Sequence, residues 1–125
     1  MKWLRIDIVL AIHKQQIAEH GGADGVRDIG LLDSALARPQ NLASYKPETD
    51  IASLAAAYGF AIARNHPFVD GNKRTALAAT RTFLYINKYG LNATQQEKFD
   101  TFLSLAEGSL AEDELNAWIR SRLIR

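Results

Sequence analysis

The sequence predicts an all-α fold, a compact bundle of six helices with one central buried helix. Apolar residues recur with the spacing of a helix face through most of the chain, and glycines or prolines separate these segments. No repeat, linker or low-complexity tract interrupts them. The 125 residues predict a single domain over 1–125, with a folded accessible surface of about 6,700 Å².

Composition excludes several classes of protein. The absence of cysteine excludes a disulfide scaffold, a thiol nucleophile and a thiolate metal site. A net charge of +1 gives no reason to expect attraction to nucleic acid or membranes. No apolar run approaches the roughly 18 residues of a membrane span, and the start of the chain does not resemble a signal peptide. We therefore expect a cytoplasmic protein that binds neither nucleic acid nor membranes directly.

The first two helices are predicted from their apolar faces and from the residues that stop them. Apolar positions over 6–17 fall on one helix face, and Gly21-Gly22 ends that helix. A short second helix over 31–36 ends at Pro39, because proline disrupts helical hydrogen bonding. Residues 41–49 show no clear period and predict a loop or a small hairpin.

The third and fourth helices flank the most polar loop of the chain. Asp50 can cap the third helix, which must stop near Asn65 because Pro67 disfavours helical geometry in the residue before it. The fourth helix is predicted over 72–89, with Gly90 after its end. Apolar residues spread around much of this fourth helix, which predicts that it is the central one.

Two further helices complete the bundle. Apolar spacing over 99–106 predicts the fifth, ended by Gly108. Ser109 and Glu112 have the spacing of a capping box, in which each side chain satisfies a free amide of the helix start. The sixth helix follows, with its apolar face over 115–123.

Residues 66–75 form the densest polar stretch and have the chemistry of a phosphate site. The start of the fourth helix offers unpaired amides and the positive end of its dipole. Gly71 leaves room for a phosphate to approach the backbone, with Asn72 beside it. Lys73 and Arg74 add positive charge.

Two side chains of the same stretch could act on a bound nucleotide. Asp70 is an oxygen ligand suited to Mg²⁺, and His66 is of the residue type that most often takes a proton from an attacking hydroxyl. The same spacing also fits a well-capped helix start, with Asn72 as the cap and ordinary surface charges after it. Spacing alone leaves both interpretations open.

This stretch resembles the signature of the Fic/Doc family, HxFx[D/E]GNxR. All six fixed positions match: His66, Phe68, Asp70, Gly71, Asn72 and Arg74. The glycine-rich region over 21–32 and the segment 37–39 are similar to Doc-type members, so the likeness covers essentially the whole chain. It implies a Fic/Doc-like bundle in which residues 42–48 form a small flap loop or hairpin that aligns a target segment, and in which Phe68 anchors the loop in the core.

The resemblance implies an activity and distinguishes two branches of the family. Members generally transfer AMP from ATP to a target hydroxyl, and they have glycine after the motif asparagine and a second arginine three positions after the first. Here those positions hold Lys73 and Leu77, as in Doc-type members. Those are toxins that act as protein kinases: they transfer the ATP γ-phosphate to a threonine of elongation factor Tu and so arrest protein synthesis.

The implied roles follow the motif. His66 would be the general base, Asp70 would bind Mg²⁺, and Gly71, Asn72, Lys73 and Arg74 would hold the triphosphate of ATP. A Phd-like antitoxin is the implied partner, because Leu77 removes the arginine through which many members inhibit themselves. AMP transfer and a non-catalytic antitoxin-binding module are the alternatives.

His13 lies on the apolar face of the first predicted helix. A buried, hydrogen-bonded histidine is favoured there over a catalytic one. No two histidines have the spacing of a helical zinc site.

Overall fold

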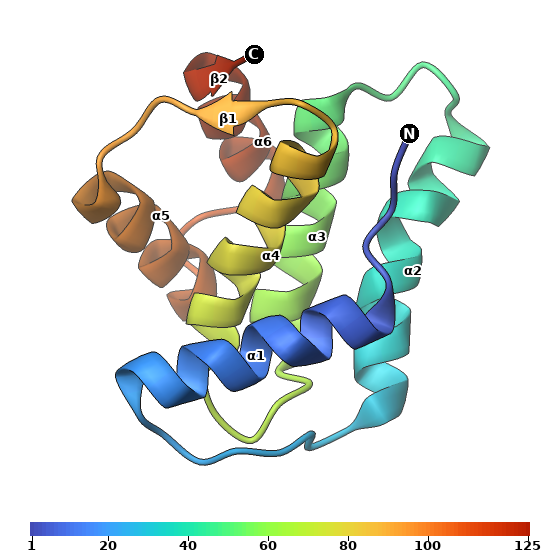
Figure 1. Ribbon diagram of the computed structural model, residues 1–125. Helices are drawn as coiled ribbons and strands as arrows, with labels where there is room; N and C mark the ends of the chain where they lie inside the picture. The colour runs from blue at the N-terminus through green and yellow to red at the C-terminus, as the bar shows by residue number, and fades with distance from the viewer.

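A computed structural model covers residues 1–125 and contains six helices and one pair of two-residue strands (Figure 1). The elements are α1 (Ile6–His20), α2 (Ile29–Tyr45), α3 (Ile51–Asn65), α4 (Asn72–Ile86), β1 (Gly90–Leu91), α5 (Gln95–Glu107), α6 (Glu112–Arg122) and β2 (Leu123–Ile124). The all-α prediction is confirmed, and the accessible surface of 6727 Å² agrees with the value expected from length. No helix combines the length and apolarity that crossing a bilayer requires.

The central helix is α3, not α4 as the apolar pattern predicted. Eleven of the fifteen residues of α3 are buried, whereas α4 buries one face and leaves the other partly open. Gly59 explains how neighbours reach α3 so closely: a methyl group there would lie 2.8 Å from Oγ1 of Thr80 and 3.0 Å from Cε2 of Phe102. Small residues along α3 therefore let α4 and α5 pack against its backbone.

The second helix is longer than predicted, because Pro39 lies inside α2 and does not end it. Leu42 and Ala43, beyond the proline, pack against the core, and this packing outweighs the hydrogen bond that proline cannot make. Since the helix continues to Tyr45, the predicted loop or hairpin over 41–49 is wrong for most of its length. Of the expected flap loop or hairpin over 42–48, a short loop remains before α3, and no hairpin forms there.

The fourth helix ends three residues earlier than predicted, at Ile86. Nδ2 of Asn87 donates to the carbonyl oxygens of both Phe83 and Lys2, at 2.9 Å each, which caps the helix and ties the N-terminus to it. Lys88 then takes the left-handed conformation (φ 69°) that was predicted for a glycine. Gly90 instead pairs with Ile124 in the antiparallel β1–β2 pair, which the sequence analysis missed.

The cap predicted for the sixth helix is also displaced. Oγ of Ser109 donates to the carbonyl of Ser104 at the end of α5, and Ala111 takes the cap position of α6 in its place. The helix begins at Glu112, and Oε1 of Glu114 accepts the N–H of Ala111 at 2.9 Å. The fifth helix has a capping box that the prediction did not include, formed by Thr94 and Glu97, and it ends at Gly108 (φ 84°) as expected.

Candidate active site

The polar loop that joins α3 to α4 borders a cavity of about 290 Å³. The chain leaves α3 through His66, which has a left-handed backbone (φ 50°, ψ 57°). The residues that line the cavity are His66, Val69, Asp70, Gly71, Asn72, Lys73, Arg74 and Ala106. All six predicted site residues therefore border one cavity, which α5 closes on one side through Ala106.

His66 has a fixed backbone and a free ring. Nε of Arg27 donates to the carbonyl oxygen of His66 at 2.7 Å, and Nη2 of Arg27 donates to that of Asn65 at 2.8 Å. These bonds satisfy carbonyls that the end of α3 leaves unpaired. The imidazole itself is exposed and makes no hydrogen bond with the protein. The arrangement leaves both ring nitrogens available to a substrate.

The segment between α1 and α2 holds the outer edge of this loop (Figure 1). The N–H groups of Arg27 and Asp28 donate to the carbonyl of Pro67, and the N–H of Val69 donates to the carbonyl of Gly25 at 3.0 Å. Residues 25–28 and 67–69 thus lie antiparallel, like two short strands. Sequence analysis did not single out Arg27 as a site residue, because a surface arginine 39 positions away carries no local signal.

Asn72 closes the loop from inside and does not cap α4. Its Oδ1 accepts the N–H of Phe68 at 2.9 Å, and its Nδ2 donates to the carbonyl of Phe68 at 3.0 Å. The residue at the cap position is Gly71 (φ 75°), which has no side chain to offer. Of the two interpretations that spacing left open, helix capping by Asn72 is therefore wrong. Its buried amide is also engaged, so Asn72 could contact a phosphate only through its backbone N–H.

The start of α4 is left uncapped. The N–H groups of Asn72, Lys73 and Arg74 find no acceptor in the protein, and Thr75 is the first to bond, to the carbonyl of Gly71 at 2.9 Å. Arg74 makes no ion pair, and Nζ of Lys73 lies 4.6 Å from the ring centre of Phe99 on α5. Three free amides and two cations at the positive end of a helix make a site for an anion.

Asp70 presents a charged and oriented carboxylate next to this anion site. Its Oδ1 accepts the N–H of Gly71 at 2.8 Å, and its Oδ2 accepts that of Ala23 at 3.3 Å. The N–H of Gly71, then that of Ala23 and the charge of Arg74, hold the pKa of the Asp70 carboxyl below its ordinary value. The carboxylate is therefore ionised at neutral pH, and its remaining lone pairs face solvent.

The donor set around Asp70 suits a metal that is shared with a substrate. No group of three or more histidine, cysteine, aspartate or glutamate side chains gathers anywhere in the chain, so the protein alone cannot enclose a metal. A single carboxylate that works together with substrate phosphates is the usual mode for Mg²⁺. Gly22 keeps this carboxylate accessible, because a methyl group there would lie 2.7 Å from its Oδ2.

Phe68 and His13 form the floor of the loop. Phe68 is 1% exposed, so its predicted burial in the core is confirmed. His13 stacks on it, with ring centres 3.9 Å apart and ring planes 5° from parallel, and Nε2 of His13 lies 2.8 Å from the carbonyl oxygen of Asp70. The prediction that His13 is buried and hydrogen-bonded is confirmed.

The comparisons with known proteins place the sequence of this loop in a family. The sequence model of the Fic/DOC family matches residues 3–84, which is more than half of the chain and includes the whole loop. The chain belongs to the Fic/DOC family. As a Fic/DOC member it departs from the AMP-transferring pattern at Lys73 and Leu77.

Two curated relatives show which members of the family this chain is similar to. The chain is 51% identical over 74 residues to "Toxin Doc" of Mycolicibacterium smegmatis, a match that covers 58% of this chain and 57% of the relative. It is 36% identical over 87 residues to "Protein kinase doc" of Escherichia phage P1, which covers 70% and 69% respectively. The chain thus matches a little over half the length of the first relative and about two thirds of the second.

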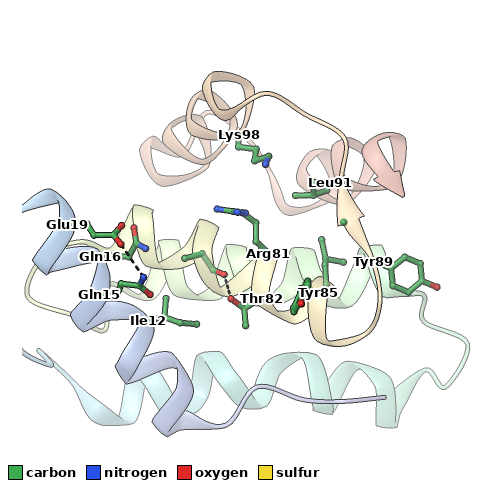
Figure 2. Close-up of a pocket in the computed structure, with 13 residues that line it drawn as sticks. Ile12, Gln15, Gln16, Glu19, Arg81, Thr82, Tyr85, Tyr89, Leu91 and Lys98 are labelled. Atoms are coloured by element: carbon green, nitrogen blue, oxygen red, sulfur yellow. Dashed lines mark hydrogen bonds between the residues drawn. The ribbon is translucent and has the colours of Figure 1, made fainter. Parts of the chain in front are cut away.

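A second cavity of about 560 Å³ lies away from the loop, between α1, α4, α5 and β1 (Figure 2). Arg81 on α4 and Lys98 on α5 line it, and neither makes an ion pair. Burial, followed by the charge of Arg81, lowers the pKa of the Lys98 ammonium. Across the groove, the carboxylate of Glu19 accepts a hydrogen bond from Gln15. Because the lining has two cations, Arg81 and Lys98, and one carboxylate, Glu19, the groove has an excess of positive charge that would attract carboxylates.

Proposed function

We propose that this chain is a Doc-type toxin, a protein kinase that transfers the γ-phosphate of ATP to a threonine hydroxyl of elongation factor Tu and thereby arrests protein synthesis. The observation that carries the proposal is the uncapped start of α4, where three free amides border the same cavity as the exposed His66 and the oriented carboxylate of Asp70. The printed names of the two relatives support the toxin and kinase parts.

In the proposed reaction His66 is the general base. The threonine oxygen attacks the γ-phosphorus, the bond between that phosphorus and the bridging oxygen to the β-phosphate breaks, and ADP leaves with the electron pair. The hydroxyl proton passes to the imidazole of His66, whose ring nitrogens are free of protein partners. The fixed backbone of His66 supports this role, because base and hydroxyl must meet within hydrogen-bond distance.

The remaining residues position the phosphates and neutralise their charge. The amides of Asn72, Lys73 and Arg74 and the guanidinium of Arg74 would bind phosphate oxygens, which suits a reaction governed by positioning and electrostatics. Asp70 would hold Mg²⁺. When bound, Mg²⁺ neutralises charge that develops on the phosphates.

We assign the choice between phosphate and AMP transfer to Lys73. Its side chain occupies the position where the AMP-transferring pattern has glycine, and its ammonium rests on Phe99 beside the anion site. This bulk would exclude the α- and β-phosphates from the anion site and so present the γ-phosphate to His66. Lys73→Gly is expected to restore AMP transfer, seen in the mass spectrum of the modified target as an adenylyl rather than a phosphoryl increment. An unchanged product from the folded variant would contradict the assignment.

A labelling assay tests the reaction type. The purified chain is incubated with Mg²⁺, elongation factor Tu and ATP labelled at either the γ or the α position. Transfer of γ label alone supports the kinase, and transfer of α label supports the alternative, AMP transfer to a protein hydroxyl. If neither label is transferred, the same assay on a whole-cell lysate distinguishes a different protein target from a non-catalytic module.

Asp70→Asn tests the metal role, because it keeps the size of the side chain and removes its charge. We expect the Mg²⁺ concentration for half-maximal rate to rise by roughly 10–100-fold, measured by titrating Mg²⁺ at saturating ATP. Asp33→Asn is the matched control, an exposed carboxylate on α2 without hydrogen-bond partners, and it should change nothing. An unchanged Mg²⁺ requirement in the Asp70 variant would exclude this carboxylate as a ligand.

The pH dependence follows from the lowered pKa of Asp70. A depressed pKa favours the charged form, so Mg²⁺ binding through Asp70 should persist on acidification and be lost only as the pH falls through this lowered value. Any loss of activity between pH 7 and 5 should therefore come from another group.

We further propose a small Phd-like antitoxin as the partner that controls the toxin. The name of the M. smegmatis relative supports a toxin that needs such control. Position 77 also supports a separate inhibitor. It holds leucine, whereas the self-inhibition known in the family requires an arginine there. An acidic antitoxin segment would fit the groove of Figure 2, since Arg81 and Lys98 have no ion-pair partners there.

A further inference from the structure

We propose that His13 is a positioning residue of the active site: it orients the peptide between Asp70 and Gly71 and, through that peptide, the carboxylate of Asp70. The inference rests on the proposed role of Asp70 and adds a residue outside the family motif. It starts from the hydrogen-bond partner of this core histidine, a backbone carbonyl in the active loop that lies 2.8 Å from Nε2.

The planarity of the peptide between Asp70 and Gly71 couples two hydrogen bonds, the one to His13 and the one to the Asp70 carboxylate. In a trans peptide the C=O and the N–H point in opposite directions from one rigid plane. The carbonyl of the Asp70–Gly71 peptide points at Nε2 of His13, while its N–H donates to Oδ1 of Asp70 at 2.8 Å. Rotation of this plane would break both bonds together. The imidazole therefore determines the direction in which the carboxylate is held.

The surroundings of His13 leave it one orientation. Its ring is 2% exposed and lies flat against Phe68, so stacking fixes the ring plane. A carbonyl oxygen only accepts, so Nε2 must carry the hydrogen. The ring also packs beneath Gly71, where an added methyl group would lie 3.7 Å from Nε2. A ring that only filled space would not need a donor at this atom.

Three substitutions separate donation from packing. His13→Phe keeps an aromatic ring against Phe68 and removes the donor. His13→Gln places an amide nitrogen the same number of bonds from Cα as Nε2. His13→Asn is the matched control, because its amide nitrogen corresponds to Nδ1 and cannot reach the carbonyl of Asp70. If His13 only fills the core, phenylalanine should serve better than either amide.

The first readout needs neither metal nor nucleotide. Amide hydrogen exchange is followed by NMR at Gly71 and Ala23, whose N–H groups both bond to the Asp70 carboxylate. We expect exchange at both to be about fivefold to tenfold faster in His13→Phe and His13→Asn, and close to wild type in His13→Gln. Unchanged exchange in a folded His13→Phe protein, or no recovery in a folded His13→Gln protein, overturns the inference.

The second readout is metal affinity, with Mn²⁺ as the probe in the presence of a non-hydrolysable ATP analogue. Binding of Mn²⁺, followed by electron paramagnetic resonance, should weaken about tenfold in His13→Phe and recover in His13→Gln. Equal Mn²⁺ affinity in all variants overturns the inference while leaving the kinase proposal intact. Conversely, a wild-type protein that transfers no phosphate in the labelling assay contradicts the kinase, and the exchange measurement still decides the role of His13.

Discussion

His66→Ala is expected to lower the rate of phosphoryl transfer by roughly 10²–10⁴-fold, the usual contribution of a positioned general base. The fold should be unaffected, because the imidazole is exposed and bonds to no protein group. Arg27 holds the backbone at this position through carbonyl oxygens, which alanine retains. Initial rates with γ-labelled ATP and a melting curve of the same sample measure both effects.

The control for this variant is His20→Ala at the exposed end of α1, which should keep the wild-type rate. It matches the chemical change and lies outside the loop. A folded His66→Ala protein that still transfers phosphate at the wild-type rate would falsify the assignment of the base. Arrest of growth by that variant in cells would carry the same meaning.

Phe68→Ala is expected to destabilise the protein by about 3–5 kcal/mol, the range for removing a buried phenylalanine ring. Phe68 is 1% exposed, and its ring supports His13, so the substitution leaves a cavity beneath the active loop. The rate of phosphoryl transfer should also fall at temperatures where the variant is folded, because the active loop loses the buried ring that supports it. Denaturant unfolding followed by circular dichroism measures the stability change.

Val69, the next residue in the loop, provides the control for this loss of stability. Val69 is 54% exposed, and Val69→Ala should change the free energy of unfolding by less than about 0.5 kcal/mol. A similar loss of stability in both variants would mean that the loop contributes through its backbone and not through the buried ring. A large loss in Phe68→Ala alone would establish the ring as the anchor.

Most of the helices were predictable because they bury one face, and this leaves a period of about 3.6 in the sequence. The errors occur where distant contacts override local preference. Pro39 fits inside α2 because Leu42 and Ala43 pack beyond it. The early end of α4 depends on Asn87 and its bonds to the N-terminus, a partner 85 positions away. No local pattern carries such information.

The residues of the candidate site could likewise be predicted only in part. The residues that line the cavity are nearly contiguous in the chain, so the motif and its spacing identified them together. Arg27 and His13 reach the loop through backbone carbonyls, which have the same chemistry whatever the side chain and so leave no trace in the motif. Asn72 was identified but misread, because an amide that bonds to the preceding loop looks like a helix cap in sequence.

The antiparallel contact between residues 25–28 and 67–69 also bears on the order of events at the ribosome. Residues 25–28 leave the exit tunnel about forty positions before the segment on which they lie, so α1 and α2 emerge without the surface that completes the loop. The ammonium of Lys73 finds its aromatic support only after Phe99 has followed. A partly synthesised chain thus has neither a fixed His66 nor a complete anion site, and the candidate active site is assembled only after synthesis has passed Phe99.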